Sequence, residues 1–144
     1  MKRLILLLAF AGPAYADDDF IATVTDPLTK TECSACHMAY PPVFLPAASW
    51  QKIMNNLPDH FGEDASLPEA DARNIEAWLV ANAASERAIK GVDLANPPLR
   101  ISELPWFKRK HDREVSAKAI ARAGSMANCA ACHRGAESGY FSDD

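Results

Sequence analysis

The chain has 144 residues, with 15 basic and 19 acidic side chains and a formal net charge of −4 near neutral pH. This length suits one compact domain or two small lobes. The acidic balance argues against a nucleic-acid partner, because affinity for nucleic acid comes from a basic surface.

Residues 1–16 have the pattern of a secretory signal peptide. A basic start at Lys2 and Arg3 is followed by an apolar run over residues 4–11 and by an A-x-A cleavage pattern at residues 14–16. This run is much shorter than the roughly 20 residues that cross a bilayer, which disfavours an N-terminal membrane anchor. We expect cleavage after Ala16. The mature chain would then have 128 residues, with 13 basic and 19 acidic side chains and no membrane span.

Short helices and loops are expected at the start of the mature chain. Residues 17–25 form at most an extended lead-in. Asp26 and Pro27 have the form of an N-cap and a first helical residue, so a short helix should lead into the stretch Cys33-Ser34-Ala35-Cys36-His37. Three prolines then predict an apolar loop over residues 38–46.

Two longer helices should follow this loop. The first covers residues 46–56, where apolar side chains recur at intervals of three and four residues. After a polar loop that carries His60, Ser66 and Glu69 have the S-x-x-E form of a capping box and predict an amphipathic helix over residues 68–84. Its apolar face consists of Ala72, Ile75, Trp78, Leu79 and Ala83.

A proline-containing loop at residues 91–98 is the predicted boundary between two lobes. The N-terminal lobe covers residues 17–98 and the C-terminal lobe covers residues 99–144.

The C-terminal lobe should contain three short helices. The first starts at residues 102–105 and bears His111, and the second is an alanine-rich segment at residues 114–123 that ends at Gly124. The third carries residues 129–133. Because no alternating pattern of useful length occurs, we predict an all-α fold with long loops.

Two copies of the pattern C-x-x-C-H contain every cysteine of the chain. This is the spacing of covalent haem c attachment. Two thiols one helical turn apart can each form a thioether with a haem vinyl group, and the next residue brings an imidazole to the iron. We therefore predict two covalently attached haem c groups. The motif residues are Cys33, Cys36 and His37 in the first copy and Cys129, Cys132 and His133 in the second.

Three other uses of the cysteines compete with this prediction. A four-cysteine zinc site gives no reason for a His after each pair, and a thioredoxin-like dithiol needs a βαβ context that is absent from the pattern. A disulfide framework does not require this spacing. All three are disfavoured.

The histidine count suggests that both axial positions of each iron are filled. Beyond His37 and His133, the chain has only His60 and His111, one for each iron. Without haem, a His in such polar stretches would more often be a solvated side chain. Local pairing, His37 with His60 and His111 with His133, closes the shorter loops. A crossed arrangement stays open, because loop entropy changes slowly with length.

A methionine thioether is the alternative sixth ligand. Met38 and Met126 lie too close in sequence to the attachment motifs to reach the opposite haem face. Met54 could reach an iron, but its register with neighbouring apolar residues indicates a core position.

Residues 108–113 form the one dense basic cluster, KRKHDR. A solvated helix face is the simplest interpretation. Pairing with haem propionates and docking of a partner around a haem edge are two functional alternatives. The sequence does not separate the three.

Several whole phrases resemble the small dihaem cytochromes c of bacterial periplasms. These are ECSACHMAYPPVFLPAASWQKIMNNLPDHFGEDASL, NIEAWLVANAA, WFKRKHDREV and CAACHRGAESGYF, spread over most of residues 32–141. The resemblance implies a periplasmic location, bis-His iron at both haems and a helical fold whose N-terminal lobe is similar to class I cytochrome c. It also implies electron transfer with redox proteins, such as an oxygen-binding monohaem cytochrome c or a membrane cytochrome b.

An electron carrier is therefore the leading hypothesis, since two irons with filled axial positions leave no open site for a substrate. The alternative is a small dihaem redox enzyme, a peroxidase or a small-oxide reductase, in which one distal His leaves the iron. A haem-based sensor also needs an open site, and the chain shows no signalling domain.

Overall fold

The computed structural model describes residues 20–85 and 87–142, and these residues are helical with long connecting loops. The predicted signal peptide lies outside them. The described part has two isolated β-bridges and no strand, and none of its helices has the length and apolar character to cross a bilayer. The all-α prediction is thus confirmed. The α-helices are α1 Pro27–Cys33, α2 Ala47–Met54, α3 Glu69–Ala81, α4 Pro105–His111 and α5 Ala117–Ala123.

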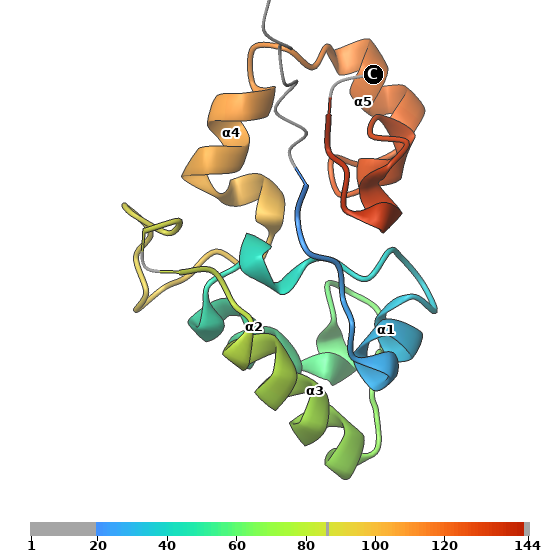
Figure 1. The fold of residues 1–144 in the computed structure, drawn as a ribbon, viewed down its shortest axis with the longest axis vertical. Helices are drawn as coiled ribbons and strands as arrows, with labels where there is room; N and C mark the ends of the chain where they lie inside the picture. Colours follow the sequence, from blue (N-terminus) through green and yellow to red (C-terminus); the bar gives the residue numbers. More distant parts are fainter. Residues whose placement is uncertain (1–19, 86, 143–144) are drawn as a thin grey trace, which may run out of the picture.

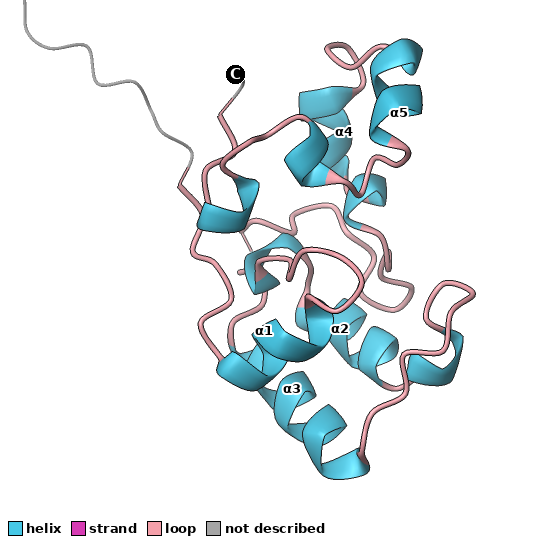
Figure 2. Cartoon of the chain, turned by 90° about the vertical axis from the view of Figure 1, so that its right-hand side faces the viewer, coloured by secondary structure: helices cyan, strands magenta, loops and turns pink. Residues whose placement is uncertain are grey.

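The helices form two groups along the long axis of the molecule. Figure 1 shows α1, α2 and α3 in the lower part and α4 and α5 in the upper part. Loops fill much of the middle (Figure 2). In the lower group α2 packs against α3, and Ile75 and Leu79 of α3 are almost fully buried. Burial of two such side chains contributes about 1.5–3 kcal/mol each.

The core crosses the predicted boundary between the lobes. Leu104 and Phe107 belong to the same buried cluster as Trp50 and Ile75. The N-terminal segment also reaches the other end of the chain, where the Ile21 N–H donates to the Gly139 carbonyl at 2.8 Å. The division at residues 98 and 99 stays a prediction, although both sides share one core.

Local signals account for two of the helix ends. The Asp26 carboxylate accepts hydrogen bonds from the Thr29 backbone N–H and hydroxyl, both at 2.8 Å, as expected for an N-cap. At its C-terminus, α5 stops at Gly124, whose φ of 77° is a conformation that favours glycine. Both predicted signals are confirmed.

The predicted cap of α3 was wrong, whereas α4 and the second motif have the short helices that the sequence predicted. Ser66 does not cap α3, because its N–H and hydroxyl bond to the nearer Asp64 carboxylate at 2.9 and 2.5 Å, and Pro68 takes the N-cap position. Such local bonds compete with helix caps. Helix α4 starts at Pro105, after a separate 3₁₀ turn at Ile101–Glu103. The second attachment motif lies on a short helix, as predicted, and this helix is the 3₁₀ turn Cys129–Ala131.

Replacing Asp26 by alanine should destabilise the protein by about 0.5–2 kcal/mol, because two donors at the start of α1 lose their acceptor. Chemical denaturation of the holoprotein measures this change. Asp26→Asn is the control, since asparagine also caps helices and should retain most of the stability. An Asp26→Ala variant as stable as the parent would contradict the capping role.

Candidate haem sites

The first site joins the end of α1 to the loop after α2. Helix α1 ends at Cys33, so Cys36 and His37 lie in the turn that follows. His60 follows the 3₁₀ turn Leu57–Asp59 and is held by paired backbone hydrogen bonds with Glu63, at 2.8 and 3.2 Å. The His37 and His60 rings lie opposite each other across the site, with their centroids 6.2 Å apart and their planes 18° from parallel.

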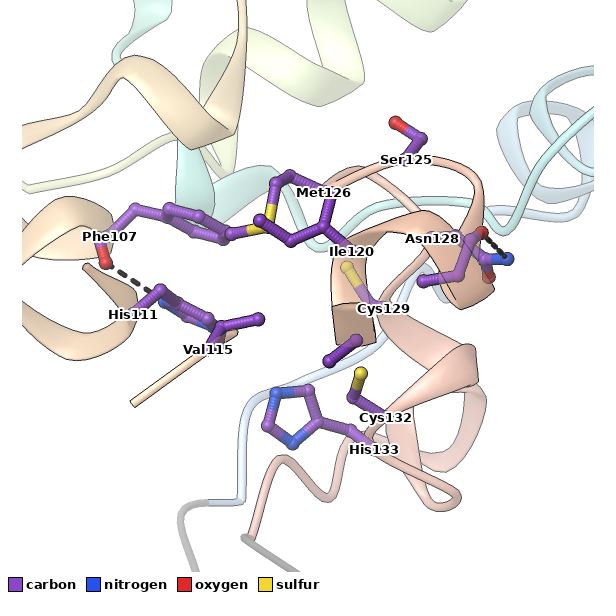
Figure 3. A pocket seen from close by; sticks show the side chains of 12 residues that line it. Phe107, His111, Val115, Ile120, Ser125, Met126, Asn128, Cys129, Cys132 and His133 are labelled. Atoms are coloured by element: carbon purple, nitrogen blue, oxygen red, sulfur yellow. Dashed lines mark hydrogen bonds between the residues drawn. The ribbon is translucent and has the colours of Figure 1, made fainter. Parts of the chain in front are cut away.

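The second site lies between α4 and the C-terminal turns. His111 is the last residue of α4, and its ring centroid lies 6.1 Å from that of His133, with the planes 86° apart. A pocket opens between these residues (Figure 3). Cys129 and Cys132 line this pocket together with both histidines.

The distances between the rings fit an iron between each pair. A metal–imidazole bond of about 2.0–2.1 Å, with the ring centroid about 1.1 Å beyond the nitrogen, puts two imidazoles on one metal about 6.3 Å apart. The observed 6.2 and 6.1 Å agree with this value. The structure thus brings together the two local pairs that loop length favoured.

Backbone carbonyls orient three of the four imidazoles. Nδ1 of His37 lies 2.7 Å from the Met38 carbonyl, Nδ1 of His111 lies 2.9 Å from the Phe107 carbonyl, and Nδ1 of His133 lies 3.1 Å from the Ser142 carbonyl. A carbonyl only accepts, so each Nδ1 carries the proton and leaves the Nε2 lone pair free for a metal.

His60 is the exception. In the described part of the chain its ring makes no hydrogen bond, and its contacts are with the rings of His37 and Phe61. Partial burial lowers the pKa of His60, and the nearby His37 and Arg100 lower it further. The ring is therefore held neutral, the form that binds a metal.

Aromatic rings cover two of these imidazoles, and neither ring was predicted from the sequence to belong to a site. Phe107 stacks on His111 with centroids 3.8 Å apart and planes 7° apart. Tyr40 stacks on His37 at 4.8 Å and 18°. Phe107 lies four residues before His111, and Tyr40 lies three residues after His37. The i,i+4 spacing of Phe107 and His111 on one predicted helix is the signal that could have identified the first pair.

Tyr40 also connects the two sites. Its hydroxyl donates to the Ala127 carbonyl at 2.7 Å, two residues before Cys129. Burial, and then the nearby Cys129, raise the pKa of Tyr40 to about 12. The hydroxyl therefore stays protonated and remains a donor at physiological pH.

The thiol environments disfavour the competing uses of the cysteines. Burial, and then Glu32, raise the pKa of the Cys33 thiol to about 11, and burial also raises the pKa of Cys129. A redox dithiol needs a reactive thiolate, which the burial of Cys33 and Cys129 disfavours. All four cysteines are unbridged, and residues 20–85 and 87–142 hold no cluster of three metal-binding side chains.

Comparison with known proteins identifies the family. A family model described as dihaem cytochrome c matches residues 29–141. The chain belongs to this family. Its two C-x-x-C-H motifs accordingly carry two covalently attached haem c groups, and the dihaem cytochrome c fold is consistent with electron transfer.

Solved structures of dihaem cytochromes c are similar over most of the chain. A diheme cytochrome c from Rhodobacter sphaeroides is 60% identical, covers 85% of this chain and 99% of its own, and has a TM-score of 0.78. A second structure, of DHC purified from Rhodobacter sphaeroides, is 62% identical, covers 83% and 100%, and has a TM-score of 0.74. The diheme cytochrome from Shewanella baltica is 38% identical, covers 81% and 86%, and has a TM-score of 0.68. The comparison with curated proteins gave no significant match.

Proposed function

We propose that this dihaem cytochrome c is a periplasmic electron carrier in which both haems are bis-His ligated and low-spin. His37 and His60 ligate the first iron, and His111 and His133 ligate the second. The observation that carries the proposal is the spacing of the two imidazole pairs, 6.2 and 6.1 Å, which suits one metal between each pair.

When bound, each haem supplies an iron that gains or loses one electron. The chain supplies two imidazoles to each iron, which favours lower reduction potentials than a His/Met pair. Three of these imidazoles are oriented by backbone carbonyls, so the ligand set is preorganised by the fold. With both axial positions filled, the irons exchange electrons without binding a substrate.

The proposed location and partners follow from the expected signal peptide and the family. Cleavage after Ala16 would release the mature chain into the periplasm. Redox proteins are the proposed partners, including an oxygen-binding monohaem cytochrome c or a membrane cytochrome b.

Optical and EPR spectra of the oxidised and reduced holoprotein, with and without carbon monoxide, test this function. We expect low-spin spectra in both oxidation states, no thioether–iron charge-transfer band and no binding of carbon monoxide. A high-spin component, or ready binding of carbon monoxide after reduction, would refute a carrier with two fully ligated irons.

One observation supports a second candidate, a small dihaem redox enzyme such as a peroxidase or a small-oxide reductase. His60 is the one histidine whose ring has no hydrogen bond in the described residues, and Phe61 beside it has a positive φ of 58°. Such a ligand is less firmly held than His111. Carbon monoxide binding at the first haem alone, after reduction, would favour this candidate.

A further inference from the structure

Charged side chains are unevenly divided along the molecule. Residues 20–98 carry ten acidic and five basic side chains, whereas residues 99–144 carry eight basic and six acidic ones. The first range contains α1, α2 and α3, and the second contains α4 and α5, at opposite ends of the long axis (Figure 1). The molecule is therefore electrically polar, with its basic end around the second haem site.

Much of this positive charge lies on the two helices that frame the second site. Lys108 and Arg109 lie in the last turn of α4, three and two residues before His111, and both are exposed. Lys118 and Arg122 are exposed on α5, four residues apart and thus on one face of that helix. We refer to these four side chains as the basic surface.

The residues of the basic surface do not line the pocket of the second site, and the lining of this pocket is mostly apolar. Phe107 and His111 of α4, and Ile120 of α5, line this pocket (Figure 3). The neighbouring basic residues thus lie outside the pocket lining while belonging to the same two helices. The positive charge therefore lies on the two helices that line the second site.

We propose that the basic surface is the docking surface for an acidic redox protein, which exchanges electrons with the second haem. This inference rests on the proposed carrier function and adds the charge of the partner and the end of the molecule that it contacts. Charge complementarity is the physical reason, because a positive patch steers an acidic partner and raises its association rate. Acidic side chains predominate in residues 20–98, so the same partner is repelled from the end of the molecule that contains α1, α2 and α3.

The salt dependence of the electron-transfer rate tests this surface. The donor is reduced plant-type ferredoxin, an acidic protein, mixed with the ferric holoprotein in a stopped-flow instrument. Each ferredoxin loses one electron, and one haem iron goes from ferric to ferrous. We expect the second-order rate constant to fall about threefold or more between 10 and 300 mM salt, as the Debye length shrinks from about 30 Å to below 10 Å.

The sign of this change separates a local patch from the charge of the whole molecule. The mature chain is acidic overall, so a rate governed by net charge would rise with salt as repulsion is screened. A rise in the parent protein would overturn the proposal. A rate that does not depend on salt would overturn it too, because it would mean that the cations are solvated or neutralised by haem propionates.

Charge-reversal variants locate the effect. Lys108→Glu/Arg109→Glu should abolish or invert the fall with salt. Arg87→Glu/Lys90→Glu makes the same change in net charge at exposed positions before α4 and should keep the fall. Equal effects of the two double variants would overturn the assignment to α4. Oxidation of the fully reduced holoprotein by hexacyanoferrate(III) tests the carrier function separately from the docking surface. Each haem should give one electron to one hexacyanoferrate(III) ion. A holoprotein that reduces fewer than two of these ions would overturn the carrier function itself.

Discussion

Replacing His111 by alanine should convert the second haem from low-spin to high-spin. His111 is the only imidazole in the described part of the chain placed 6.1 Å from His133, so its loss leaves one axial position of that iron without a protein ligand. The first haem should keep its spectrum, because His37 and His60 are untouched. EPR of the oxidised holoprotein should therefore show one high-spin and one low-spin haem per chain.

Two comparisons make this result specific. His60→Ala should give the complementary change, with the first haem high-spin and the second unchanged. Added imidazole should return the His111→Ala variant to a low-spin spectrum by filling the position that the side chain left. A His111→Ala variant with the spectrum of the parent protein would mean that His111 is not a ligand.

The second large effect expected is a difference between the EPR signals of the two haems. The imidazole planes are 18° apart at the first site and 86° apart at the second. Two iron d orbitals can interact with the π systems of the axial imidazoles. Nearly parallel rings interact with the same one of these two orbitals, so the energies of the two orbitals differ. Perpendicular rings act on one orbital each and leave the two nearly equal. We therefore expect a rhombic low-spin signal from the first haem, and from the second a signal dominated by one low-field feature.

Phe107 should maintain this difference, because it lies parallel to the His111 ring at 3.8 Å. Phe107→Leu keeps an apolar side chain and the backbone carbonyl that binds His111 Nδ1, but it removes the ring that restricts rotation of the imidazole. The low-field feature should broaden and move towards the rhombic signal, and the potential of the second haem should fall as the ferric state gains orbital splitting. Phe107→Tyr, which keeps the ring, should retain the parent signal.

The first haem provides an internal control in the same sample. Trp106→Leu is the matched variant, since Trp106 contacts the Phe107 ring from the same helix without stacking on His111. If Phe107→Leu and Trp106→Leu shift the second signal equally, the effect reflects a general loss of packing. A parent protein with two identical signals would contradict the ring geometry.

Local features of the chain were predictable wherever one residue decides the conformation of its neighbours. Asp26 before Pro27 marked the start of α1, and Gly124 marked the end of α5. The predicted cap at Ser66 was wrong for a reason that is also local, because the Ser66 hydroxyl donates a hydrogen bond to the nearer Asp64 carboxylate. The 3₁₀ turn at Cys129–Ala131 has no helix-breaking residue within it, so nothing in its own sequence distinguished it from an α-helical turn.

The sequence by itself determined the covalent haem attachment of this dihaem cytochrome c and limited the chain to four histidines. Residue type and short spacing indicate the attachment motifs, and composition gives the number of histidines. None of these depends on how the helices are arranged. Only the tertiary structure decided which histidines face each other, at what angle their planes meet, and which ring stacks on each. It also placed Tyr40 against Ala127, 87 residues away, and joined the two haem sites. Such contacts depend on how the helices pack, and loop length constrains that packing only weakly.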